Sequence, residues 1–158
     1  MDIILAAALL PAIILMVYVY KHDKIEKEPF VLLLTLFAFG ALSCVPAGIL
    51  EDLFSEVLDS MNIQDNQTYY IIMCFGIVAC SEEGAKLFFL KSKTWRCPDF
   101  NYTFDGLLYS VCVGLGFAGL ENIMYVMDYG FGVVISRGLL SIPGHCTFAI
   151  FMGLFYSR

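Results

Sequence analysis

Long apolar stretches separated by short polar connectors dominate the pattern of this chain. Ile3 to Tyr20 is an unbroken apolar run of 18 residues. At 1.5 Å per residue it reaches about 27 Å, close to the roughly 30 Å of a bilayer core. Further apolar stretches of helical length follow, so the pattern predicts an all-α, polytopic membrane protein with about five transmembrane helices. The expected spans are residues 3–20, 29–50, 68–90, 103–126 and 130–156.

The polar connectors refine this picture. Residues 51–66 are acidic with apolar side chains at helical spacing, which predicts a short interfacial helix. Pro46 is expected to kink the end of the second span. A cleaved signal peptide is the alternative for the first run. Its positive charges would precede the run, whereas the lysines of this chain follow it, which favours a retained helix. We see no repeat and no soluble domain, and therefore expect one integral membrane domain over residues 1–158.

Composition agrees with the membrane assignment. The chain has 158 residues, of which 59% are hydrophobic and 15% charged, whereas soluble domains have about 25% charged residues. A formal charge of −6 does not indicate nucleic acid as a partner. The six cysteines lie mostly in apolar runs without zinc-binding spacing, which indicates small buried side chains.

Loop charges predict the orientation of the chain in the membrane. The first loop has three lysines and the third has Lys91, Lys93 and Arg96, whereas the second and fourth loops have no Lys or Arg. The positive-inside rule then places the N-terminus outside the cell membrane and the C-terminus of this chain in the cytoplasm.

Polar residues inside the third span are the strongest functional signal. Glu82, Glu83 and Lys86 interrupt an apolar stretch, and each such group costs about 2.5 to 3.5 kcal/mol at a helix centre. Either glutamate can reach Lys86, and the two glutamates lie about 100° apart around the helix axis. We expect one to pair with Lys86 or with a neighbouring helix and the other to face a cavity. The alternative is a salt-bridged triplet that reaches water near a helix end.

Further polar groups lie in the last two spans. Glu121 and Asn122 follow Gly114, Gly116 and Gly119, which permit close helix packing. Asp105 is read as a charge at a helix N-terminus. Pro143-Gly144 is expected to break the fifth helix beside His145, which would then be a site residue instead of a structural hydrogen-bonding group. His145 and Glu82 fall at similar depths, whereas Glu121 falls nearer the outside on straight helices. Arg137 is either a counter-ion for Glu121 or an interfacial anchor.

These motifs, taken in order, resemble the PrsW family of intramembrane proteases, which is related to the CAAX prenyl protease/ABI superfamily. The matching segments are YKHDKIEKEP, SEEGAKLF, FDGLLYSVCVGLGFAGLENIMYV and SRGLLSIPGHCTFAIFMGLFY. The resemblance implies Glu82, Glu83 and His145 as catalytic residues. We assign Lys86, Glu121, Asn122 and Arg137 supporting roles. The family continues into further membrane helices with another histidine, so we expect this chain to be C-terminally truncated.

The resemblance implies a peptidase that cuts a single-span membrane protein in the lipid bilayer. In the namesake the substrate is an anti-sigma factor, cut outside the membrane as the first of two cuts. We expect Glu82 or Glu83 to activate water while His145 polarises the carbonyl or orients the water, with no cofactor. The alternative is a Zn²⁺ ion held by Glu82, Glu121 and His145. A non-catalytic scaffold that binds a partner helix and a proton-coupled carrier are the competing functions.

Overall fold

The computed structural model describes residues 2–22 and 27–158, and every element in these ranges is helical. Lys24, one of the three basic residues predicted in the first loop, lies outside the described residues. The all-α polytopic fold expected from the apolar pattern is confirmed. The elements are α1 (Asp2–His22), α2 (Phe30–Ser60), α3 (Asn66–Ile71), the π-helical segment η1 (Ile72–Val78), α4 (Ala79–Thr94), α5 (Thr103–Tyr129) and α6 (Val133–Tyr156).

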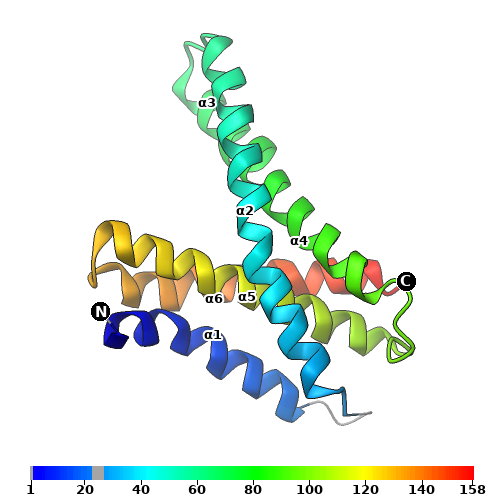
Figure 1. Cartoon of the computed structure of the whole chain (residues 1–158). Helices are drawn as coiled ribbons and strands as arrows, with labels where there is room; N and C mark the ends of the chain where they lie inside the picture. The colour runs from blue at the N-terminus through cyan, green and yellow to red at the C-terminus, as the bar shows by residue number, and fades with distance from the viewer. Residues whose placement is uncertain (1, 23–26) are drawn as a thin grey trace.

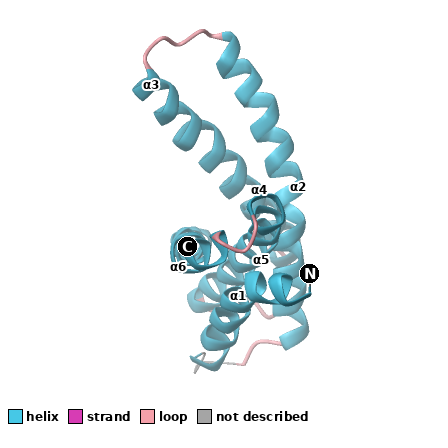
Figure 2. Cartoon of the chain, turned by 90° about the vertical axis from the view of Figure 1, so that its left-hand side faces the viewer, coloured by secondary structure: helices cyan, strands magenta, loops and turns pink. Residues whose placement is uncertain are grey.

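Helices α1, α5 and α6 run beside one another, and α2 crosses them (Figure 1). Beyond the crossing, α2 extends away from α1, α5 and α6, and the chain returns toward them through α3, η1 and α4 (Figure 2). Helix α5 lies at the centre of this arrangement, because it packs against α1, α2, α4 and α6 and most of its residues are buried.

Two glycines allow α2 and α5 to cross at very short distance. A Cβ atom on Gly40 would lie 1.9 Å from the backbone oxygen of Val113, and one on Gly116 would lie 1.9 Å from the backbone oxygen of Phe37. Only glycine fits at such positions, which is the packing device that small residues provide between membrane helices. The expected packing role of the α5 glycines is therefore observed at Gly116.

Helix α2 is longer than the sequence suggested. Residues 51–60 continue α2 past Pro46 without interruption, so the separate interfacial helix that we expected is wrong. No glycine or proline between Leu50 and Ser60 ends the helix, and it stops just before Asn62, which has a positive φ of 48°. With 31 residues, α2 is about 46 Å long and exceeds a bilayer core by roughly 16 Å.

Among the described residues, four helices are long and apolar enough to cross a membrane: α1 over residues 5–22, α2, α5 and α6. The third expected span, residues 68–90, is not among them. It is helical throughout, but it is divided into α3, η1 and α4, each shorter than 18 residues. Helix α4 also contains all the charged groups of this segment, Glu82, Glu83 and Lys86.

Helix α6 is continuous through Pro143 and Gly144, so the predicted break beside His145 is wrong. Proline removes one backbone donor from a helix, and a helix can accommodate this loss without ending. The hydroxyl of Thr147 donates to the Pro143 carbonyl at 2.8 Å, which gives this part of the helix an additional hydrogen bond. His145 is therefore presented by a regular helix.

Candidate active site

The ammonium group of Lys86 lies at the centre of the polar residues in α4. Its Nζ donates to Glu82 Oε2 at 3.0 Å and to Glu83 Oε1 at 2.7 Å. Lys86 is 1% exposed, whereas the side chains of Glu82 and Glu83 are 13% and 29% exposed. The expected division, with one glutamate paired and the other facing a cavity, is wrong, because the long side chains of both converge on the same amine.

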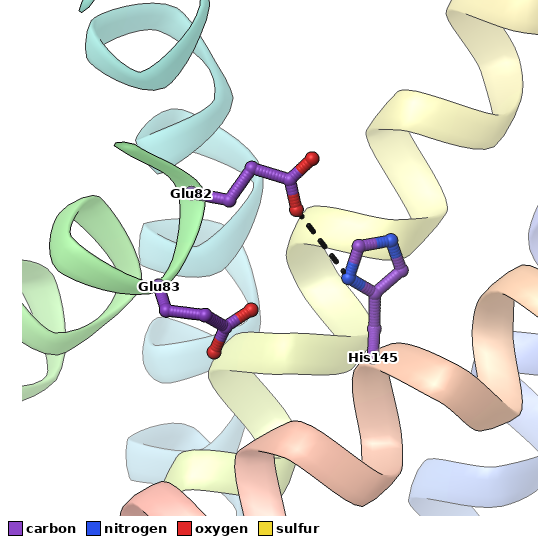
Figure 3. Close-up of side chains that lie close together, drawn as sticks. All are labelled: Glu82, Glu83 and His145. Carbon is purple, nitrogen blue, oxygen red and sulfur yellow. Dashed lines mark ion pairs between the residues drawn. The ribbon is translucent and has the colours of Figure 1, made fainter. Parts of the chain in front are cut away.

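His145 of α6 completes this cluster from the opposite side. Its Nδ1 lies 3.1 Å from Lys86 Nζ and 3.7 Å from Glu82 Oε2, and the ring points from α6 toward the two glutamates of α4 (Figure 3). The equal depth of Glu82 and His145 that the sequence predicts is therefore consistent with a direct contact. The arrangement is also more than a salt bridge within one helix, because it joins α4 to α6.

Glu121 of α5 contacts the other ring nitrogen of His145. Its Oε2 lies 2.9 Å from His145 Nε2, so Glu121 joins the cluster, although straight helices were expected to place it nearer the outside. The helix bounds explain the difference. Glu121 lies eight residues before the end of α5, and His145 lies twelve residues after the start of α6. Their depths differ by only about 6 Å, which the two long side chains span.

Arg137 is the counter-ion of Glu121, one of the two roles left open by the sequence. Its Nη2 lies 2.7 Å from Glu121 Oε2, and its Nε donates to Asn122 Oδ1 at 2.8 Å. Asn122 is buried and donates in turn to the Ala8 carbonyl of α1 at 2.9 Å. These contacts tie α1, α5 and α6 together behind His145, and they hold Glu121 against its ring.

Apolar contacts fix the position of the histidine. The Phe117 ring of α5 lies 5.4 Å from the His145 ring, and Lys86 Nζ lies 3.8 Å from the Phe117 centroid. A Cβ atom on Gly114 would lie 3.3 Å from the His145 carbonyl and 2.8 Å from Ala149 Cβ, so this glycine lets α6 approach α5 at the site. Phe117 lies in a matched motif segment, but the sequence did not predict its contact with the histidine, because nothing distinguishes it from the other aromatic residues of an apolar helix.

A cavity of about 330 Å³ opens beside these polar groups. Its polar wall consists of Glu82, Glu83 and His145, and its other lining residues are Cys74, Phe75, Val78, Ala79 and Phe148. Phe75 and Phe148 are largely exposed, so the cavity is accessible from the surface of the bundle. Several of the lining residues belong to η1, and π-helical turns are frequent at functional sites. The sequence did not predict this segment.

Donor atoms of Glu82, Glu83 and His145 lie within 4.8 Å of one another, a spacing at which a metal ion could be held. This set differs from the one expected from sequence, because Glu83 takes the place of Glu121. Each of the three side chains, however, already contacts Lys86 Nζ at 2.7 to 3.1 Å. With Lys86 in this position, the residues do not fit a metal ion.

A second buried polar group, away from the cavity, was not recognised from sequence. The Tyr109 hydroxyl donates to Glu28, which precedes α2, and to the Asp99 carbonyl at 3.2 Å. Burial, together with the nearby charges of Asp105 and Asp99, raises the pKa of Glu28, although the hydrogen bond from Tyr109 opposes this shift. Asp105 accepts from the Tyr102 amide at 2.6 Å, which confirms its expected place at a helix N-terminus.

Comparisons with known proteins agree with this architecture. The model of the family described as PrsW family intramembrane metalloprotease matches residues 28–158. The chain is 29% identical to Protease PrsW of Geobacillus kaustophilus, covering 98% of the chain and 66% of that protein. It is 32% identical to Protease PrsW of Clostridioides difficile, with 96% and 63% covered, and 28% identical to Protease PrsW of Bacillus subtilis, with 98% and 68% covered.

The chain thus spans somewhat less than two thirds of the length of the first two of these relatives. No solved structure is significantly similar to it. The family model covers most of the chain, including α2 and all the residues of the polar cluster. The chain therefore belongs to the PrsW family of intramembrane proteases.

Proposed function

We propose that this chain contains the hydrolytic centre of an intramembrane protease that cleaves a single-span membrane protein of the anti-sigma factor type. The observation that supports this most directly is the cavity beside α4. It combines two carboxylates and an imidazole on one wall with an apolar lining on the other. Such a cavity can accept an apolar segment and hold a water molecule at the polar wall, the two requirements of peptide hydrolysis within a membrane.

We assign Glu83 as the general base. Its side chain is 29% exposed against 13% for Glu82, and among the described residues it pairs with Lys86 alone. Glu83 would take a proton from water as the resulting hydroxide attacks the scissile carbonyl carbon. When the C–N bond breaks, the same carboxyl group would return that proton to the leaving amine. No metal ion takes part in this sequence of steps.

His145 is assigned to hold this polar wall in position, because its two ring nitrogens are engaged by Lys86 and Glu121. Its ring is held by Glu121 at 2.9 Å, and Glu121 is held in turn by Arg137 at 2.7 Å. Glu82 Oε2 lies 3.0 Å from Lys86 Nζ and 3.7 Å from His145 Nδ1, so Glu82 helps to hold these two groups together. A ring fixed on both sides needs no reorganisation during the reaction, which is the advantage of a preorganised site.

The expected orientation in the cell membrane is part of the proposal. Lys21 and Lys27 flank the first loop, and Lys91 and Lys93 lie at the end of α4, whereas residues 61–65 have no basic side chain. Reporter domains inserted after Asn62 and after Lys93 test this arrangement. The positive-inside rule predicts that the first reporter is active outside the cell and the second inside; the reverse result would refute it.

The test of the proposed activity is cleavage of single-span membrane proteins in liposomes. The chain is reconstituted with candidate substrates, and the wild type is compared with Glu83→Gln. Glu56→Gln, which changes an exposed glutamate of α2, is the matched control. Loss of a general base is expected to lower turnover by about 10²- to 10⁴-fold, whereas the control retains wild-type turnover.

The same experiment distinguishes the competing functions. A scaffold would bind the single-span protein equally well in both forms and release no fragments from either. A proton-coupled carrier would instead show pH-driven flux that Glu83→Gln abolishes, without cleavage. Either pattern would refute the proposed proteolysis.

A further inference from the structure

The Lys86 ammonium is a positive charge that lies among the three candidate metal ligands of this site. Its Nζ lies 3.0 Å from Glu82 Oε2, 2.7 Å from Glu83 Oε1 and 3.1 Å from His145 Nδ1. The two carboxylates and the imidazole are the side chains whose donor atoms are grouped closely enough to hold a metal ion. The amine is 1% exposed and lies among them.

The hydrogen-bonding capacity of the ammonium matches these three neighbours. A protonated lysine has three N–H donors and no acceptor, and three acceptor atoms surround it. A neutral His145 with its proton on Nε2 accepts from Lys86 at Nδ1 and donates to Glu121 at 2.9 Å. The Phe117 ring lies 3.8 Å away and adds a cation–π contact. All three donors of the buried charge are therefore satisfied.

The surrounding groups otherwise have the character of a metal site. A histidine that binds zinc usually donates its second ring nitrogen to a carboxylate, as His145 can to Glu121. A metal ion, however, would need the single lone pair of His145 Nδ1 that now accepts from Lys86, and it would compete with the ammonium for both carboxylates. It would also lie against a buried positive charge. The lysine and a metal ion therefore exclude each other.

We propose that Lys86 is the resident cation of this site and takes the position that a metal ion would occupy if the lysine were absent. Its role is that of a positioning residue, because its buried amine holds Glu82, Glu83 and His145 together without lining the cavity. This inference concerns the occupancy of the site and does not depend on the proposed proteolysis.

Metal uptake by the purified chain tests the inference. Wild type and Lys86→Ala are equilibrated with Zn²⁺ or Co²⁺ in detergent, freed of unbound ion, and measured by elemental analysis and by the visible absorption of Co²⁺. The six free cysteines can bind ions elsewhere, so each form is compared with a partner that also has His145→Ala. Lys91→Ala, which changes an exposed lysine of the same helix, is the matched control.

The wild type and Lys91→Ala are expected to hold no ion that His145→Ala removes. Lys86→Ala is expected to bind about one additional ion per chain, with the strong absorption of four-coordinate Co²⁺, and to lose it with His145→Ala. One equivalent of His145-dependent metal in the wild type would overturn the inference. Lys86→Met serves as a second variant, and both are checked for helicity by circular dichroism. Failure of every folded Lys86 variant to bind an ion would also overturn it.

Discussion

The close crossing of α2 and α5 leads to a quantitative prediction for Gly116→Ala. A Cβ atom at this position would lie 1.9 Å from the Phe37 carbonyl oxygen, whereas ordinary contacts begin at 3.4 Å. The two helices must therefore separate by about 1.5 Å, because the contacted atom belongs to the backbone. Overpacking of this kind costs roughly 1–3 kcal/mol of stability.

The separation also affects the active site. Helix α4 packs against α2, and α6 packs against α5, so the site is divided between the two sides of this crossing. If the full 1.5 Å reaches the site, the 3.1 Å contact between Lys86 and His145 lengthens to about 4.6 Å and is lost. A displacement of about 1 Å in a catalytic arrangement can lower the rate about 100-fold.

The assay measures thermal unfolding in detergent together with substrate cleavage in liposomes. Gly48→Ala in α2 is the matched control, because a Cβ atom there meets nothing within 4 Å. We expect Gly116→Ala to lose both stability and activity and Gly48→Ala to lose neither. If the two variants behave alike in both measurements, the packing argument is refuted.

Three further predictions concern single side chains. Arg137→Ala should lower stability by roughly 1–3 kcal/mol in thermal unfolding, because Glu121 loses its partner in a partly buried site. Arg137→Lys should recover part of the loss. Equal stability of the wild type and both variants would contradict this. Phe148→Ala enlarges the cavity and should change the preference between substrates with large and small apolar residues at the cut by about tenfold in kcat/KM, whereas Phe151→Ala, an exposed site on the same helix, should not. The pKa of Glu28 is raised in the folded protein, so the folded form binds more protons than the unfolded form. The wild type should therefore lose stability relative to Glu28→Gln as the pH rises above 4.5. A gain of stability with rising pH would contradict the raised pKa.

The sequence predicted the elements well because lipid-facing helices are apolar over their whole length. The sequence-based prediction failed where a few backbone hydrogen bonds decide whether a helix is continuous or interrupted. The predicted break at Pro143 is absent, and residues 51–60 extend α2. The π-helical geometry of residues 72–78 could not be predicted, because nearly all of their side chains are apolar, as in an α-helical span.

The candidate site was predictable to a similar extent. Glu82, Lys86 and His145 stand out because charged or polar groups are costly in apolar segments, and the structure brings them together. What the sequence could not predict is that both glutamates and the histidine share one amine. Helical spacing describes contacts within α4, but the approach of α6 depends on the packing of Gly114 and Phe117.

The most direct test of the central claim is single-turnover cleavage of a single-span membrane substrate by wild type and by Glu83→Gln. The account predicts that cleavage by the variant falls by at least about 100-fold while substrate binding is retained. Cleavage by Glu83→Gln at the wild-type rate would contradict it.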